Sequence, residues 1–174
     1  MPSSADEREM AMKIALAADH RGRFIKEKIA AMLNEKGHDV IDMGTNSARS
    51  CDYPDIGYRA AKAVAEGNVE RGILICGTGI GMSIVANKVA GVRAALCNDE
   101  LTAQISRRHN DANVLCLAAD VLGEEVMRRI VESWLVTQFE EGGRHTRRVM
   151  KIESIERGED PGTTCGPTDP TNGQ

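Results

Sequence analysis

Short apolar runs alternate along the chain with stretches that have helical periodicity. Each run is rich in Ile, Leu, Val, Ala or Cys, and each is long enough for a strand but too short for an ordinary helix. Most are bounded by Gly, Asp or Asn, which favour turns. We therefore predict buried strands at residues 13–18, 39–44, 71–76, 92–97 and 112–118.

Apolar residues recur at helical spacing between and after these strands. In the first such segment, 24–37, Ile25, Ile29 and Leu33 fall on one face, and Gly37 provides a stop signal. Asn98 or Asp99 is placed to cap a later helix. Further helices are predicted at residues 56–67, 80–91, 98–109, 123–141 and 144–157.

The alternation of strands and helices predicts an α/β fold. Buried strands joined by helices form a parallel sheet that is covered on both faces. Right-handed crossovers then give a three-layer α/β/α sandwich around a Rossmann-like, five-stranded parallel sheet. Ligands of such folds bind beyond the carboxyl ends of the strands. We therefore look for chemistry at Asp19 and His20, at Cys76, and after the strands that end at 97 and 118.

The two ends of the chain differ from the middle in composition. Residues 13–157 carry the periodic pattern and are expected to form one domain. Residues 1–12 are polar and read as a flexible extension. Residues 158–174 are rich in Gly, Pro, Thr and Asp, and we expect a disordered tail there that contains Cys165.

Charge and cysteine usage narrow the class of protein. Lys plus Arg total 22 and Asp plus Glu total 26, a net charge of −4, so a general nucleic-acid binder is not expected. No apolar run approaches the roughly 18 residues of a membrane span, and the first residues lack the pattern of a secretory signal. The five cysteines contain no CxxC pair, which argues against a disulfide framework or a zinc ribbon and fits the reducing cytoplasm.

The segment RGILICGTGIGMSIVANK, residues 71–88, is the most informative stretch. A strand ends in Cys76, and Gly77, Gly79 and Gly81 lead into a helix. Such glycines let several N–H groups converge on an anion. A dinucleotide loop is the weaker interpretation, because Met82 stands where the pattern GxGxxG requires its third glycine and no GK[ST] follows.

A thiol at a strand end beside a helix N-terminus favours its thiolate form. The Cys76 thiolate is then able to take a proton from a carbon next to a carbonyl, while loop amides and the hydroxyl of Thr78 hold the resulting enediolate. On the residues alone, Cys76 is explained equally well as a small side chain that fills the buried core.

Five motifs in order resemble one family. They are AADHRG (17–22), DYP (52–54), ICGTGIGMSIVANK (75–88), SRRHNDANVL (106–115) and GGRHTRRV (142–149). Over residues 12–157 the chain is similar to the ribose-5-phosphate isomerase B family, whose relatives include allose-6-phosphate isomerase and the galactose-6-phosphate isomerase subunits.

The resemblance implies an aldose–ketose isomerase that interconverts D-ribose 5-phosphate and D-ribulose 5-phosphate without metal or cofactor. Cys76 then corresponds to the base, Thr78 to part of the enediolate cradle, and His109 to the acid that opens the furanose ring. Arg144 and Arg148 correspond to a phosphate clamp. The remaining implied substrate contacts are Asp19, His20, Tyr53, Gly77, Gly79, Ile80, Gly81 and Asn110.

Several of the implied residues also have a structural interpretation. Asp19 suits a helix cap, Tyr53 a packing ring, His109 a polar surface position, and Arg144 with Arg148 a solvated basic face.

Two positions depart from the pattern of some relatives. Asp120 stands where several of them carry a phosphate-binding Arg, and an acid there is expected to repel phosphate. Met82 stands where other relatives have a Glu base, which favours the thiol mechanism. A six-carbon sugar phosphate and a non-catalytic sugar-phosphate or nucleotide binding module therefore stay open as alternatives.

The resemblance also implies an oligomer. The site of this family lies between two subunits, and the basic C-terminal segment reaches across to the partner. We expect a homodimer or homotetramer.

Overall fold

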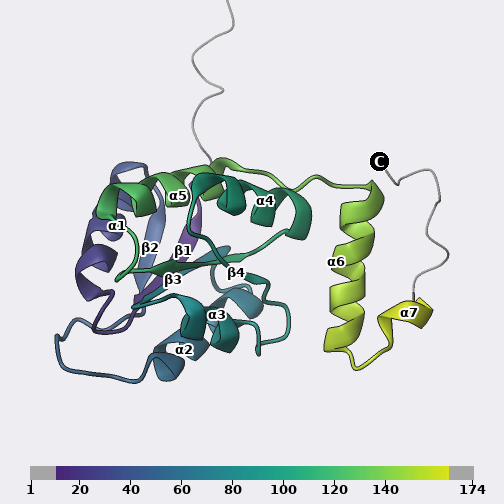
Figure 1. Ribbon diagram of the computed structural model, residues 1–174, viewed down its shortest axis with the longest axis horizontal. Coiled ribbons are helices and arrows are strands. Elements are labelled where there is room, and N and C mark those ends of the chain that lie inside the picture. Colours follow the sequence, from purple (N-terminus) through teal and green to yellow (C-terminus); the bar gives the residue numbers. More distant parts are fainter. Residues whose placement is uncertain (1–10, 165–174) are drawn as a thin grey trace, which may run out of the picture.

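The computed structural model describes residues 11–164, and its centre is a five-stranded parallel sheet in the order β2-β1-β3-β5-β4 (Figure 1). The central strand, β3, pairs with β1 on one side and with β5 on the other. The predicted parallel sheet is confirmed. The strands are β1 (Lys13–Ala18), β2 (Asp39–Asp42), β3 (Arg71–Cys76), β4 (Ala94–Leu96) and β5 (Val114–Ala118).

Helices cover both faces of the sheet, which confirms the predicted three-layer sandwich (Figure 1). Successive side chains of a strand point to opposite faces, so Ile14 and Leu16 pack with α1, α4 and α5. Ala15 and Ala17 pack with α2 and α3 on the other side. The helices are α1 (Arg23–Glu35), α2 (Tyr53–Ala65), α3 (Ile80–Ala86), α4 (Glu100–Asn110), α5 (Glu124–Val136), α6 (Gly143–Glu156) and α7 (Pro161–Thr164).

Two helix starts follow from local chemistry. Of the two predicted caps, Asp99 is the one that caps α4, since its side chain accepts a 2.7 Å hydrogen bond from the Thr102 N–H. Helix α2 begins at Tyr53, before the predicted start at residue 56, because Pro54 fits the first turn of a helix.

Helix α3 ends at Ala86, so the predicted helix over 80–91 was too long. The side chain of Asn87 ends it. Its Nδ2 donates to the carbonyls of Ser83 and Ala94, each at 2.9 Å, and its Oδ1 accepts the Ala94 N–H at 2.9 Å. These bonds tie the end of α3 to β4.

Helix α5 ends at Val136, and the predicted extension to residue 141 is wrong. Thr137 has extended backbone angles, and the segment after it lies against α4. The Glu140 N–H donates to the Arg108 carbonyl at 3.0 Å, and the two side chains form an ion pair. Contacts with α4 thus override the helical periodicity of the sequence.

Helix α6 contacts α4 and extends away from the sheet (Figure 1). The short helix α7 lies inside the segment predicted as a tail, and its Pro161 carbonyl accepts a 2.8 Å hydrogen bond from Lys151 Nζ. The rest of that segment, with Cys165, and most of the predicted N-terminal extension lie outside the described residues. Within residues 11–164, no helix is both long and apolar enough to cross a membrane.

Candidate active site

Cys76 ends the central strand and is buried, with 5% of its surface exposed. Its Sγ accepts a hydrogen bond from the Gly79 N–H at 3.2 Å. Gly79 has a φ of 71°, in the left-handed region, and a Cβ there would lie 2.5 Å from Leu96 Cδ1. Position 79 therefore requires glycine, and the loop after the strand directs a main-chain donor at the sulfur.

A cavity of about 420 Å³ opens over this loop. Five of the ten predicted substrate contacts line it, together with the predicted catalytic residues Cys76 and Thr78. Residues Arg21, Ile84 and Asp120, which the resemblance does not name as site residues, line it too. The lining consists of Asp19, Arg21, Tyr53, Cys76, Gly77, Thr78, Ile80, Gly81, Ile84 and Asp120.

Tyr53 and Gly81 form one wall of the cavity. A Cβ on Gly81 would lie 2.5 Å from the ring of Tyr53, so glycine lets the ring approach the start of α3. Tyr53 is 38% exposed, and its ring therefore both packs on the loop and borders the cavity.

Asp19 and His20 follow β1 and have different surroundings. The buried Asp19 accepts the N–H groups of Arg21 at 2.9 Å and Gly22 at 3.1 Å through Oδ1. It stabilises the turn before α1, whose N-cap is Gly22. His20 is half-buried, and its Nδ1 accepts the Cys51 N–H at 3.3 Å.

Six predicted site residues are not part of this cavity lining within the described part of one chain: His20, Gly79, His109, Asn110, Arg144 and Arg148. Asn110 lines a second cavity of about 350 Å³ between β4, α4 and α6. The two arginines lie on α6 and are exposed.

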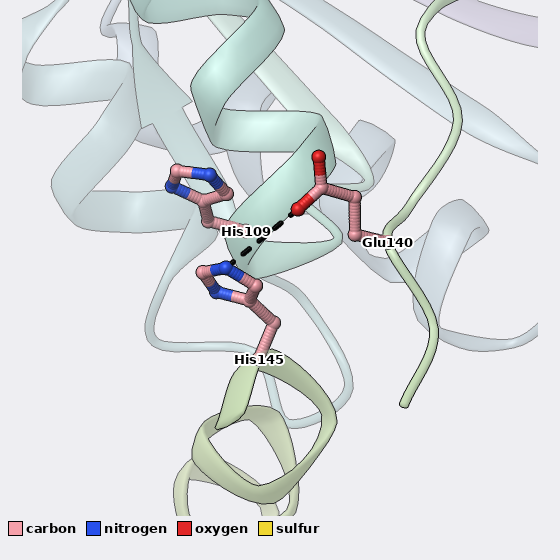
Figure 2. Close-up of side chains that lie close together, drawn as sticks. All are labelled: His109, Glu140 and His145. Atoms are coloured by element: carbon pink, nitrogen blue, oxygen red, sulfur yellow. Dashed lines mark ion pairs between the residues drawn. The ribbon is translucent and has the colours of Figure 1, made fainter. Parts of the chain in front are cut away.

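His109 at the end of α4 stacks on His145 of α6, with ring centroids 4.1 Å apart (Figure 2). Glu140 Oε2 lies 3.7 Å from His145 Nε2. Burial above all, and then His109 and Arg144, lower the pKa of His145, while Glu140 acts in the opposite direction. The ion pair with Arg108 lowers the pKa of Glu140.

The same three side chains are of metal-binding types, and their candidate ligand atoms lie within 4.8 Å of one another. The two imidazole planes are inclined by only 5°. Because nitrogen lone pairs lie in the ring planes, parallel rings do not direct both lone pairs at one ion. The cluster is arranged for stacking, and a metal-independent reaction stays a prediction.

Arg21 is the charged cavity residue that the sequence pattern did not single out. It follows Asp19 and His20 directly at a strand end, which was the available signal. Its Nε donates to Asp120 Oδ2 at 2.5 Å, so the acid at position 120 is paired across the cavity wall.

Comparisons with known proteins agree with the fold. The profile of the ribose/galactose isomerase family matches residues 14–152. The chain is 51% identical over 145 residues to ribose-5-phosphate isomerase B of Escherichia coli, covering 83% of this chain and 97% of that protein.

Two solved structures are similar throughout the domain. Ribose-5-phosphate isomerase B of Clostridium thermocellum has a TM-score of 0.83 at 50% identity and covers 84% of this chain and 99% of its own. The Mycoplasma genitalium enzyme with bound ribulose-5-phosphate has a TM-score of 0.81 at 42% identity, covering 83% and 96%. The chain therefore belongs to the ribose/galactose isomerase family, as its motifs indicate, and it is an isomerase.

Proposed function

We propose that this isomerase interconverts D-ribose 5-phosphate and D-ribulose 5-phosphate through an enediolate. The observation that carries the proposal is the Cys76 sulfur, which lines the cavity and accepts a main-chain hydrogen bond from Gly79. The similarity to ribose-5-phosphate isomerase B, and the ribulose-5-phosphate bound to the Mycoplasma genitalium structure, support this substrate.

Cys76 acts as the base in this proposal. Its thiolate takes the proton from C2 of the open-chain aldose, and the electron pair passes to O1 as the enediolate forms. The thiol then returns that proton to C1, while the proton on O2 moves to O1 and C2 becomes the ketone. The N–H groups between Gly77 and Gly81 and the hydroxyl of Thr78 stabilise the charge on oxygen.

His109 opens the furanose ring before this step, and Arg144 with Arg148 binds the phosphate. These residues border no part of the Cys76 cavity of their own chain. We therefore propose that a second copy supplies them, so that the partner's His109 meets Cys76 across a homodimer interface.

The exposed apolar residues support such a dimer. Ile80 and Ile84 beside the cavity are 54% and 56% exposed, and Met150 and Ile155 on α6 are 53% and 58% exposed. Large apolar side chains exposed in groups mark association surfaces. Helix α6, which extends away from its own sheet (Figure 1), is placed to contact another subunit. Two such dimers forming a tetramer stay within the proposal.

The reducing cytoplasm is the proposed location. The four cysteines among the described residues are all free thiols. A catalytic thiolate also needs protection from oxidation, which a reducing compartment gives.

A six-carbon sugar phosphate is the second candidate substrate. The family description covers galactose as well as ribose, and a cavity of about 420 Å³ admits either chain length. The relative kcat/KM for ribose 5-phosphate, allose 6-phosphate and galactose 6-phosphate distinguishes them.

The direct test is ketose formation by the purified full-length protein on these aldose phosphates. We expect turnover of ribose 5-phosphate with the highest kcat/KM, unchanged by a chelator. Binding without turnover would indicate a non-catalytic binding module and contradict the proposal.

A further inference from the structure

Arg21 and Asp120 form an ion pair that spans the end of the central strand. Arg21 follows β1 and Asp120 follows β5, and these two strands flank β3. A Cβ on Gly77 would lie 2.5 Å from Asp120 Oδ2 and 3.0 Å from Arg21 Nε. The pair therefore lies directly over the residue after Cys76 and forms one wall of the cavity.

Backbone contacts fix both residues. The Arg21 N–H donates to Asp19 Oδ1 at 2.9 Å, and the Asp120 N–H donates to the Gly77 carbonyl at 2.9 Å. The 2.5 Å bond to Asp120 uses Nε of Arg21. This bond does not use the two terminal nitrogens of the guanidinium. Those nitrogens form the fork that suits bidentate phosphate binding.

Arg21 is the cationic side chain among the described residues that line this cavity, and the other charged groups there are Asp19 and Asp120. Without Arg21, the lining would present carboxylates to a substrate that carries a phosphate dianion. The side chains of the pair are 56% and 38% exposed, so the pair adds little to folding stability. Its position favours a role in ligand binding.

We infer that Arg21 binds the phosphate group of the substrate and that Asp120 positions its guanidinium. This inference rests on the proposed function. Cys76 is buried and Arg21 is exposed, so a sugar whose reacting carbons lie at the thiol extends its phosphate towards the guanidinium. The sequence led us to expect that Asp120 repels the phosphate. In this arrangement it does not, because Arg21 balances its charge.

This role adds a cation from the chain that carries Cys76 to the arginines proposed to come from the second copy. The phosphate then lies between guanidinium groups of two subunits. Arg21 sets the affinity for phosphorylated sugars, whereas the chemical step stays with Cys76.

The test measures KM and kcat for ribose 5-phosphate, and Ki for inorganic phosphate, in Arg21→Ala, Asp120→Asn and the double variant. We expect Arg21→Ala to raise KM and Ki about tenfold or more, with kcat within about threefold. Asp120→Asn raises both about three- to fivefold, and the double variant matches Arg21→Ala, because Asp120 acts only through Arg21.

Arg23→Ala is the matched control. It removes an exposed ion pair with Glu27 on the same stretch of chain, outside the cavity lining, and should leave KM and Ki unchanged. An unchanged Ki in Arg21→Ala, or tighter phosphate binding in Asp120→Asn, would overturn the inference.

The inference and the proposed function can fail independently of each other. Inorganic phosphate binding is followed by phosphorus NMR in the wild-type protein and in Arg21→Ala, without any turnover. If ribose 5-phosphate is not isomerised but phosphate binding still depends on Arg21, only the proposed substrate is wrong.

Discussion

The imidazole of His145 lies flat against the imidazole of His109, with ring centroids 4.1 Å apart and planes inclined by 5° (Figure 2). His145 is buried, and its Nδ1 has no hydrogen-bond partner among the described residues. Burial lowers the pKa of this imidazole. Folding thus favours the neutral form of His145, whose ring face packs against the imidazole of the proposed ring-opening acid.

This relationship predicts a pH dependence of stability. Because folding lowers the pKa of His145, the unfolded chain binds the proton first as the pH falls below the ordinary value of about 6.5. We expect the free energy of unfolding to decrease from there until the pH passes the folded-state pKa. Urea unfolding of the wild-type protein and of His145→Gln, between about pH 8 and about pH 5, measures the effect, and the variant should lose part of the slope. Identical slopes in the two proteins would contradict the prediction.

The proposed base predicts a selective loss of activity. Cys76→Ala removes the proton acceptor, so kcat should fall by about 10² to 10⁴-fold while the circular dichroism spectrum and Tm stay close to wild type. Cys97→Ala is the matched control, because Cys97 is also buried but does not line the cavity, and burial raises its pKa. Normal turnover in Cys76→Ala would remove the thiol from the mechanism.

The surroundings of the buried Lys26 lead us to expect different losses of stability in two variants, Asp42→Asn and Lys26→Met. Lys26 is fully buried, and its Nζ donates to Asp42 Oδ2 at 2.5 Å and Asn46 Oδ1 at 2.8 Å, which ties down the loop before α2. Asp42→Asn leaves a buried charge without its counter-ion and should lower the free energy of unfolding by about 2 kcal/mol. This cost is smaller than for a fully buried pair, because Asp42 is 41% exposed.

Lys26→Met removes the charge and keeps most of the side-chain volume, so it should lower the free energy of unfolding by about 1 kcal/mol or less. Urea unfolding at one pH compares the two variants. A larger loss in Lys26→Met than in Asp42→Asn would show that the hydrogen bonds, and not the uncompensated charge, dominate at this site.

Local pattern predicted the framework of this fold because each strand and helix carries its own signal. The apolar run that ends at Cys76 and the glycines at 77, 79 and 81 specify a buried strand and a tight loop from neighbouring residues alone. The end of α5 was mispredicted because contacts between Glu140 and Arg108 compete with the helical pattern.

The pairing of Arg21 with Asp120 was outside the reach of such patterns. The two residues are 99 positions apart in the sequence, and they meet only because β1 and β5 flank β3. Strand order is a property of the whole fold, so periodicity cannot encode it. The stack of His109 on His145 likewise depends on the extended segment that joins α5 to α6.

The proposed shared site predicts complementation between two inactive variants. In a heterodimer of Cys76→Ala with His109→Asn chains, one site receives both defects and the other receives the intact Cys76 and the intact His109. We expect heterodimers isolated with two affinity tags to have roughly half of the wild-type kcat per dimer, whereas each parent homodimer stays inactive.

The opposite arrangement of the same two changes gives the control. A chain with both Cys76→Ala and His109→Asn, paired with a wild-type chain, places one defect in each shared site, so this heterodimer should be inactive. If each site were built within one chain, the wild-type subunit would keep its own site and the activities of the two heterodimers would be reversed. A protein that stays monomeric at assay concentration would also contradict the shared site. The outcome depends only on which chain supplies each residue, because both heterodimers contain the same substitutions.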